Sequence, residues 1–531
     1  MLTIRDIALP ARHDSASLIY HAAKALRIPA SEISELKIRK RSLDARKKDR
    51  IQYIYTVDVS TRHSEARVLK QCKNPKVSPS KQIIYRVPKP EGSAGDRPVV
   101  VGFGPAGMFA ALALAMAGLR PIVIERGQDA ESRHKAVARF WQTGELDPES
   151  NVQFGEGGAG TFSDGKLNTG TRDDRMGWIL EQLVRAGADE SIQYDAKPHV
   201  GTDVLRKVVQ QLRERIRSLG GEVLFETKLI GLETKDGALC GARLLSRGEI
   251  SSLPCSRLIL APGHSARDTF EMLDRLQIAM EPKPFSMGVR IEHLQSVINE
   301  AQYGPGWDAL DLPPADYKLN VHLPEGGSAY TFCMCPGGSV VAAASESGRV
   351  VTNGMSNFAR DGENANAALL VTLEPNDFPD KSTLGGMYWQ REIEQTAFQV
   401  GGGNYHAPAQ TVGDFLAKRP GTGFGAVAPS YRPGVTPCDL HRVLPGRITD
   451  VLEKAIPELG KKLKGYDDPE AVMTAPETRS SSPVRILRGE DRQSPVLSGL
   501  YPCGEGAGYA GGIMSAAVDG LLCAEAVIRS Y

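Results

Sequence analysis

The pattern of hydrophobic and polar residues between positions 97 and 127 predicts a strand, a turn, a helix and a second strand, in this order. Val99–Val101 is a short β-branched run, typical of a strand that is buried in a parallel sheet. Residues 105–118 are rich in Ala and Leu and predict a helix, and residues 121–124 predict a second strand. Because a helix separates the two strands, we expect a Rossmann-like α/β unit here.

The first 90 residues predict a separate unit with both helix and strands. Apolar residues recur at helical spacing over 15–26, with Asp14 or Ser15 as the expected N-cap. Strands are predicted over 2–9, 34–41 and 51–59. A segment rich in Pro, Gly and Ser over about 88–96 predicts a linker. We therefore expect a small α+β domain of ferredoxin-like type at residues 1–92.

Further elements are predicted along the remaining chain. Residues 202–219 have the pattern of an amphipathic helix, which leads to a strand over 222–225. Strands are also predicted over 286–291, 329–335 and 339–344. The last three indicate a mixed or antiparallel sheet, distinct from the parallel sheet of the Rossmann-like unit.

A glycine motif occupies the turn after the first buried strand. In Gly102-x-Gly104-x-x-Gly107, the first glycine permits the tight turn and the second lets the backbone approach a pyrophosphate. The third lets the helix pack closely on the strand. The helix begins with Pro105 and Ala106, and its first N–H groups are expected to face the phosphates.

An acidic residue ends the second strand. Glu125 follows Gly104 by 21 positions, and a carboxylate there can accept hydrogen bonds from both ribose hydroxyls of an adenosine. Arg126, the next residue, is included among the expected binding residues. A glycine turn that served packing alone would leave Glu125 without a role, so we predict dinucleotide binding.

The C-terminal region resembles the C-terminal FAD motif of the glutathione-reductase-like flavoprotein superfamily. A short apolar strand precedes Cys503-Gly504-Glu505-Gly506, and a second glycine cluster that includes Gly511 and Gly512 opens a helix at Ile513. In that superfamily such a segment holds the ribityl chain and phosphate. Residues 257–268 resemble the family's strand-to-glycine return segment around Gly263, although Pro262 replaces the usual Thr. The resemblance implies FAD rather than NAD.

A glycine-rich loop over 153–169 is similar to the loop that wraps the flavin in this superfamily. Its glycines, Gly158 among them, allow backbone N–H groups to converge on anionic oxygens. Thr161 and Ser163 add hydroxyl groups and Lys166 adds a positive charge. The alternative is a surface loop with a solvated lysine. Lys228 and Leu229 lie in a segment that contacts the adenine in the family.

The whole chain resembles the group of bacterial uncharacterised FAD-dependent dehydrogenases, and more distantly the geranylgeranyl reductases. Four stretches carry this closer resemblance: 288–293, 332–339, 352–356 and 477–489. The resemblance implies a Rossmann-like FAD-binding domain, an inserted mixed-sheet cap domain and the small N-terminal α+β domain. We expect the FAD-binding domain to be discontinuous, at 97–280 and 484–531, and the cap to occupy 281–483.

Composition fits two or three globular domains in 531 residues, with 41% hydrophobic and 24% charged residues. The longest apolar run, 108–118, is too short to span a bilayer, and the first 30 residues contain no signal-peptide pattern. Eight scattered cysteines favour a reducing cytoplasm over a disulfide framework. We expect a cytoplasmic protein without a membrane span.

Charge is divided unevenly along the chain. Residues 1–90 contain 20 Lys/Arg and 8 Asp/Glu, whereas the remaining residues contain 44 and 55. The basic cluster over 37–50 is either a solvated face, a surface that docks on the acidic body, or a site for an anionic partner. Because the chain shows no signature of an RRM, KH or OB domain, nucleic acid is not the favoured partner.

Candidate catalytic residues are Cys333, Cys335 and His264. In a regular strand the two thiols would point to the same face, either as a redox pair at the flavin or as small packing side chains. Two cysteines alone offer too few ligands for zinc or an iron–sulfur cluster, so we expect no metal. His264 is either a proton donor or a structural hydrogen-bonding residue.

Three arginines in the cap are further candidates. Arg290, Arg360 and Arg479 could each bind a carboxylate or phosphate, or form surface salt bridges.

The sequence therefore predicts an FAD-dependent oxidoreductase that transfers hydride to or from an unidentified small molecule. The chain has no second Rossmann motif, so the reductant is a transiently bound NAD(P)H, an electron-donor protein or the substrate itself. Two alternatives remain: a flavin-dependent RNA-modification enzyme that uses the basic domain, and a non-catalytic flavin-binding redox sensor.

Overall fold

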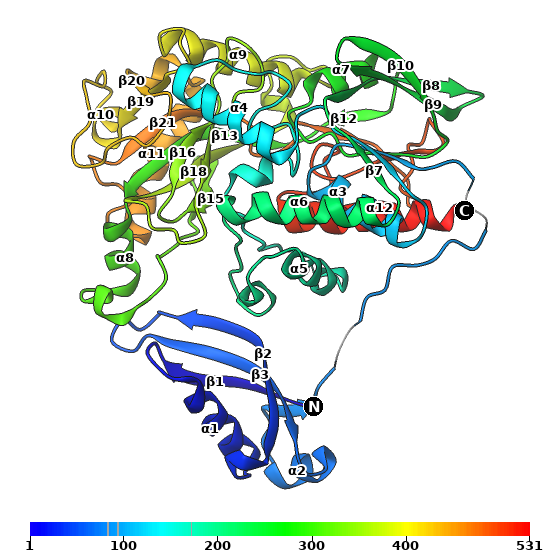
Figure 1. Ribbon diagram of the computed structural model, residues 1–531. Helices are drawn as coiled ribbons and strands as arrows, with labels where there is room; N and C mark the ends of the chain where they lie inside the picture. The colour runs from blue at the N-terminus through cyan, green and yellow to red at the C-terminus, as the bar shows by residue number, and fades with distance from the viewer. Residues whose placement is uncertain (82–83, 93–94, 171) are drawn as a thin grey trace.

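The computed structural model describes residues 1–81, 84–92, 95–170 and 172–531. Figure 1 shows three parts: a small N-terminal unit, a central parallel sheet with its helices, and a larger mixed sheet beside it. The predicted fold class, a Rossmann-like domain with an inserted mixed-sheet cap and a small α+β domain, is confirmed. Positions 93 and 94 of the predicted linker lie outside the described residues.

The N-terminal unit is a four-stranded antiparallel sheet with two helices. Its elements are β1 (Leu2–Pro10), α1 (Ser15–Leu26), β2 (Ile33–Asp44), β3 (Gln52–Thr61), α2 (Glu65–Cys72) and β4 (Val77–Pro79). The order β2-β3-β1-β4 is that of a ferredoxin-like βαββαβ unit. The Asp14 carboxylate caps α1 by accepting a hydrogen bond from the Ser17 N–H at 2.8 Å. Sequence analysis did not predict α2, which has only two buried side chains.

The central sheet consists of five parallel strands in the order β23-β11-β5-β6-β7. The strands are β5 (Val99–Val101), β6 (Ile122–Ile124), β7 (Glu222–Leu224), β11 (Leu258–Leu260) and β23 (Leu500–Pro502). The last two come from segments far apart in sequence. The sheet is therefore complete only when the chain's C-terminal segment returns to it.

Alternate residues of each strand face two different hydrophobic cores. Val100 packs in a core with the helices α3 (Pro105–Met116), α5 (Arg175–Arg185), α6 (Thr202–Ser218) and α12 (Ile513–Arg529). Val99 and Val101 belong to a second core, which includes side chains of β8 (Thr227–Lys235), β9 (Ala238–Ser246) and α7 (Arg267–Arg275). β10 (Glu249–Pro254) extends the β8–β9 sheet. Burial on both faces explains the continuous apolar run at residues 99–101.

The cap is built on a seven-stranded sheet in the order β14-β15-β18-β13-β21-β19-β20. These strands are β13 (Phe285–Leu294), β14 (Asn320–His322), β15 (Ser328–Cys335), β18 (Asn364–Leu373), β19 (Ala407–Thr411), β20 (Val435–Pro437) and β21 (Val472–Glu477). The cap helices are α8 (Gln295–Tyr303), α9 (Gly385–Val400), α10 (Val412–Leu416) and α11 (Gly446–Lys462). Only β19 and β20 are parallel neighbours here, so the described sheet is mixed.

Three shorter features join the two large parts. β16 (Ser339–Ala342) pairs with β17 (Thr352–Met355), and β12 (Met280–Pro282) pairs with β22 (Val484–Ile486). The second pair brings together the two points where the chain enters and leaves the cap. α4 (Ala130–Thr143) follows the central βαβ unit, and its Trp141 indole N–H donates to the Ala342 carbonyl of the cap at 3.0 Å.

The N-terminal unit contacts the body through part of its basic cluster. The Arg41 guanidinium forms a two-pronged ion pair with Asp195 at 2.6 and 2.8 Å. The Lys48 ammonium donates to the carbonyl of Ala301 in α8 at 2.8 Å. At least two charges of the segment 37–50 therefore serve a contact within the chain.

No helix within the described ranges is both long and apolar enough to cross a membrane.

Gly107 allows α3 to approach β5. A Cβ at this position would lie 1.9 Å from the carbonyl oxygen of Gly102, which is backbone and cannot move aside. We expect Gly107→Ala to lower the free energy of unfolding by at least about 1–3 kcal/mol, measured by chemical denaturation. The matched control is Gly177→Ala in α5, where a Cβ meets nothing within 4 Å and stability should rise slightly. Equal stability of the two variants would contradict this interpretation.

Candidate functional site

A cavity of about 320 Å³ lies between the central sheet and the cap. The residues that follow four of the parallel strands, Gly102, Glu125, Ala261 and Cys503, all line it. In open α/β sheets ligands bind at the carboxyl ends of the strands, where the strand order reverses. The cavity occupies this position.

The glycine motif forms one wall of the cavity. Gly102, Gly104, Pro105 and Ala106 line it, and Gly104 is the N-cap of α3. The first N–H groups of this helix have no partner within the helix and carry its positive dipole end. Gly107 does not line the cavity, because its role is the close contact between helix and strand.

The buried carboxylate of Glu125 binds three backbone N–H groups. Its Oε2 accepts from Phe103 at 2.8 Å, and its Oε1 accepts from Gly127 and Gly155 at 2.9 Å each. The side chain also lines the cavity. Glu125 thus holds the glycine turn against the loop at residue 155, a role that the sequence did not reveal. Binding of ribose hydroxyls stays a prediction.

Arg126, Lys228 and Leu229 line the same end of the cavity. The Arg126 guanidinium binds Glu149 at 2.7 Å and Asp268 at 2.9 and 3.0 Å, and the Lys228 ammonium binds Glu149 at 3.0 Å. These ion pairs fix both cationic side chains at the cavity wall.

The glycine-rich loop contributes Gly158, Ser163 and Lys166 to the cavity wall. The Lys166 ammonium donates to the carbonyl of Met334 in β15 and so connects the loop to the cap. The Ser163 hydroxyl donates to the Gly160 carbonyl at 2.7 Å, so its proton is used within the loop.

Thr161 lies outside the cavity, which corrects its predicted role. Its side chain is buried behind the loop, and its hydroxyl is 3.3 Å from the Glu156 carbonyl that it donates to. A helical turn over Ala159–Phe162 turns this side chain away from the cavity. The spacing of hydroxyl residues in a loop does not reveal which of them face inward.

The C-terminal motif contributes Glu505, Gly511, Gly512 and Ile513 to the wall. Gly512 is the N-cap of α12, so a second helix begins at the cavity. Gly504 does not line it, contrary to the prediction. Its N–H donates to Asp519 at 2.7 Å, and a Cβ there would lie 2.7 Å from the Cβ of Ala106. Gly504 is needed for packing against α3.

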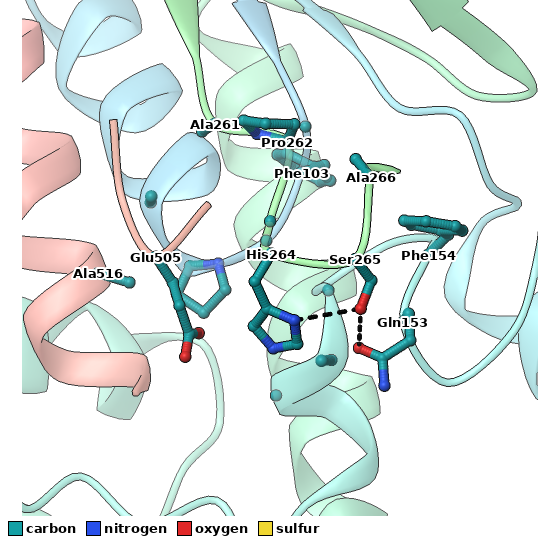
Figure 2. Close-up of a pocket in the computed structure, with 18 of the residues that line it drawn as sticks. Phe103, Gln153, Phe154, Ala261, Pro262, His264, Ser265, Ala266, Glu505 and Ala516 are labelled. Atoms are coloured by element: carbon teal, nitrogen blue, oxygen red, sulfur yellow. Dashed lines mark hydrogen bonds between the residues drawn. The ribbon is translucent and has the colours of Figure 1, made fainter. Parts of the chain in front are cut away.

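Gly263 and His264 follow β11 and line the cavity opposite Glu505 (Figure 2). The Gln153 amide donates to Ala343 at 3.3 Å, so its carbonyl oxygen accepts from the Ser265 hydroxyl at 3.0 Å. The hydroxyl oxygen then accepts from His264 Nδ1 at 3.2 Å. This order of donors assigns the proton to Nδ1 and leaves Nε2 as an acceptor.

His264 is neutral at physiological pH. Burial, reinforced by the nearby Arg479 charge, lowers the pKa of His264 to about 3. A neutral imidazole lacks the extra proton that an imidazolium carries, so the lowered pKa does not favour the acid role, which stays a prediction. The structural hydrogen-bonding role was the alternative, and it agrees with the observed contacts.

Desolvation and the charge of Lys283 act in opposite directions on the carboxyl group of Glu505. Burial raises the pKa of Glu505 to about 7, with only a partial offset from the positive charge of Lys283. The Glu505 side chain lies beside that of His264, and both residues line the cavity (Figure 2). Glu505 therefore changes its charge near neutral pH.

Cys333 lines the cavity, whereas Cys335 is buried beyond it. The pairing of β15 with β18 is interrupted between Phe332 and Cys335, and Cys333 has φ +42°. The strand is therefore irregular here, and the condition under which both thiols would point to one face is not met. A bulge changes the direction of neighbouring side chains, and alternation in sequence does not show it.

None of the three cap arginines forms a surface salt bridge, because all three side chains are buried. Arg290 binds Glu477 at 3.1 Å, Arg360 binds Asp164 at 2.9 Å and Arg479 binds Glu394 at 2.8 Å. Of the three, Arg479 lines the cavity.

Glu477 is a cavity residue that sequence analysis missed as a candidate. It ends the wholly buried strand β21, and burial raises its pKa to about 7 despite the charge of Arg290. Its Oε2 atom has no hydrogen-bond partner among the described residues. The sequence feature that could have identified Glu477 is an acidic residue at the end of a largely apolar strand.

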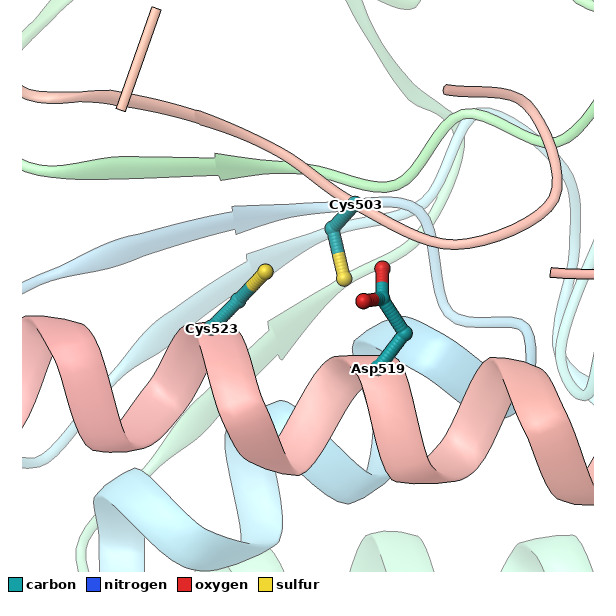
Figure 3. A group of neighbouring side chains, drawn as sticks. All are labelled: Cys503, Asp519 and Cys523. Atoms are coloured by element: carbon teal, nitrogen blue, oxygen red, sulfur yellow. The ribbon is translucent and has the colours of Figure 1, made fainter. Parts of the chain in front are cut away.

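Cys503, Asp519 and Cys523 place their potential ligand atoms within 4.8 Å of one another (Figure 3). Both Asp519 oxygens are bound by Arg488, at 2.6 and 2.9 Å, and one also by Arg492 at 2.9 Å. Two guanidinium charges therefore surround the position that a cation would take, and we assign no metal to this group.

Comparison with known proteins identifies the family. An uncharacterized protein of Clostridium beijerinckii is 47% identical over 534 residues, which cover 100% of this chain and 99% of the clostridial protein. The chain belongs to the same family as this clostridial protein. Within it, residues 97–148 match an FAD binding domain, residues 284–480 match the family described as FAD-dependent protein, C-terminal domain-like, and residues 1–60 match a domain of unknown function, DUF8436.

Two solved structures show a more distant likeness to this flavoprotein. A geranylgeranyl bacteriochlorophyll reductase-like protein of Thermoplasma acidophilum is 14% identical, with 81% of this chain and 77% of that chain covered and a TM-score of 0.36. Glycine oxidase of Bacillus cereus is 12% identical, with 82% and 95% covered and a TM-score of 0.31. At these scores the likeness carries no inference about activity.

FAD is the cofactor of this protein, which belongs among the FAD-dependent oxidoreductases. The cavity fits the cofactor, because α3 and α12 both begin at its wall and helix N-termini stabilise phosphate groups. A Cβ on Gly158 would lie 2.9 Å from the Cα of Gly104. Glycine at position 158 thus allows the glycine-rich loop to pack closely against Gly104 at the cavity wall.

Glu125→Ala removes the acceptor of three backbone N–H groups. We expect FAD affinity to fall by about 1–3 kcal/mol, since the glycine turn loses its anchor and any ribose contact disappears. The measurement is the Kd of FAD from quenching of flavin fluorescence. Glu131→Ala, at an exposed position of α4, is the control and should bind FAD as the wild type does. Unchanged affinity in Glu125→Ala would contradict this role.

Glu505→Gln tests the raised pKa. A carboxyl group whose folded-state pKa is raised contributes stability that is complete below the unfolded pKa and is lost as pH rises through the folded value of about 7. In FAD-free protein, Glu505→Gln should therefore raise the Tm relative to wild type more at about pH 8 than at about pH 5. A gain that does not depend on pH would show that Glu505 is not charged at the cavity.

Proposed function

We propose that this flavoprotein transfers hydride between FAD and a small molecule that binds in the cavity beneath the cap. The observation that carries the proposal is the continuity of one cavity from the nucleotide-binding turn at Gly102–Ala106 to Cys333, Glu477 and Arg479 of the cap. A substrate site adjoining the flavin end of the cofactor requires this arrangement. The cofactor, when bound, supplies the two-electron chemistry.

The cap residues provide the polar groups that such a reaction needs. Glu477 can hold a proton near neutral pH at Oε2, the atom without a hydrogen-bond partner among the described residues. His264 Nε2 can accept a hydrogen bond, and Lys166 brings a positive charge to the wall. Arg479 is held in place by Glu394 and also contributes positive charge at the wall.

The two alternatives from the sequence have less support. Part of the basic cluster that an RNA-modification enzyme would use contacts Asp195 and Ala301 of the same chain. A flavin that only senses redox state does not require a cavity that extends into the cap. A cytoplasmic location is supported by the free state of all eight cysteines.

We expect the purified holoprotein to be yellow and to lose its flavin absorbance when NADH or NADPH is added without oxygen. The measurement is the visible spectrum before and after each nucleotide, with dithionite as the positive control. Bleaching by a nicotinamide supports a transient NAD(P)H site. A flavin reduced by dithionite alone would instead support an electron-donor protein or direct oxidation of a substrate. A protein that does not bind added FAD would contradict the proposal.

A further inference from the structure

The bulge in β15 brings Cys333 and Cys335 into contact in an uncommon backbone conformation. Cys333 has φ +42°, a left-handed value that side chains other than glycine seldom adopt. The Cys335 thiol lies 3.3 Å from the Cys333 carbonyl oxygen. The two thiols also hydrogen-bond to each other, which raises the pKa of Cys333 and lowers that of Cys335. Strained backbone of this kind concentrates at functional sites.

A buried guanidinium group contacts the Cys335 sulfur. Nη2 of Arg290 lies 3.5 Å from Cys335 Sγ and 2.7 Å from the Cys333 carbonyl oxygen. The side chain is completely buried, and its approach requires Gly354, where a Cβ would lie 2.0 Å from Nη2. Arg290 also binds Asn366 and Glu477, which hold its guanidinium group beside the Cys335 sulfur.

The charges around this pair favour one thiolate. Together with the Cys333 hydrogen bond, the Arg290 charge lowers the pKa of Cys335 to about 6. Arg290 also binds Glu477, whose raised pKa lets it take up a proton near neutral pH. The two sulfurs thus differ: the Arg290 charge lies beside Cys335 and favours its thiolate form, whereas Cys333 lines the cavity wall.

We propose that Cys333 and Cys335 form a redox couple that exchanges two electrons with FAD. In the oxidative direction the sulfur–sulfur bond forms, the two sulfurs together lose two electrons and their remaining protons, and oxidised FAD takes up these electrons and becomes reduced FAD. The reverse step regenerates the two thiols. The inference rests on the proposed function, because it needs the flavin at the cap end of the cavity.

A second pair of neighbouring cysteines, Cys503 and Cys523, differs from the Cys333–Cys335 pair in its surroundings. Cys503 lines the cavity and lies close to Cys523, and burial raises the pKa of Cys503 well above its usual range. The arginine beside this pair, Arg488, lies 3.5 Å from Cys523 Sγ through Nη1 and is also bound by both oxygens of Asp519. Neither Cys503 nor Cys523 has the left-handed backbone conformation found at Cys333.

The test is an anaerobic titration of the air-oxidised holoprotein with dithionite. We expect wild type to take up about four electrons per FAD, two for the disulfide and two for the flavin, and Cys333→Ser and Cys335→Ser to take up about two. Cys240→Ser, at an exposed position of β9, is the matched control and should behave as wild type. Uptake of about two electrons by the wild type would overturn the inference.

Alkylation followed by mass spectrometry identifies the sulfurs directly. After unfolding in denaturant, the peptide with Cys333 and Cys335 from air-oxidised wild type should be protected from iodoacetamide, and after reduction it should gain two alkyl groups. Alkylation of both residues before reduction, or protection of Cys503 and Cys523 instead, would overturn the assignment. If the flavin is reduced normally while these thiols do not change, the inference fails and the proposed function stands. If the protein binds no FAD, both fail.

Discussion

The hydrogen bonds of the Glu125 carboxylate hold the nucleotide end of the cavity together. Its two oxygens bind backbone N–H groups from the glycine turn, from Gly127 shortly after β6 and from the loop at Gly155. Arg133 also binds this loop. Its fully buried guanidinium group donates hydrogen bonds to four backbone carbonyls of residues 151–156. Charged groups bound to several backbone partners are strong, directional anchors. Three segments distant in sequence therefore form one rigid wall.

A second group of buried charges fixes the cap over this wall. Arg267, on the side of the central sheet, binds Glu394 of α9 at 2.7 and 2.8 Å. Arg479 binds the same carboxylate from the end of the cap sheet. Removing one partner of such a buried ion pair leaves an uncompensated charge and typically costs about 3–5 kcal/mol. These pairs set the position of the cap, and with it the position of Cys333 and Glu477 relative to the nucleotide end.

The N-terminal unit has its own hydrophobic core and its own sheet. Its polar contacts with the body include the Arg41–Asp195 pair and the Lys48 contact with α8. The Arg41–Asp195 ion pair is partly exposed, and exposed pairs contribute about 0–1 kcal/mol each. The charges between the cap and the central domain are buried far more deeply, so the ion pairs of the N-terminal unit hold it less firmly than those pairs hold the cap.

The sequence by itself determined the parts of this protein that depend on local pattern. The βαβ unit with its glycine turn and Glu125, the helix that starts at Ile513, and the first three strands and first helix of the N-terminal unit all have short-range signals in apolar spacing, glycine position and capping. Those signals located most of the residues that line the nucleotide end of the cavity.

Tertiary structure decided which side chains reach the cavity and in what state. Thr161 and Gly504 carry the expected residue types but lie behind the wall, and a bulge at Cys333 interrupts the strand alternation from which the directions of the two thiols would be expected. The lowered pKa of His264 and the raised pKa of Glu477 depend on burial by segments hundreds of residues away. Side-chain direction and desolvation are properties of the packed molecule, so no local pattern contains them.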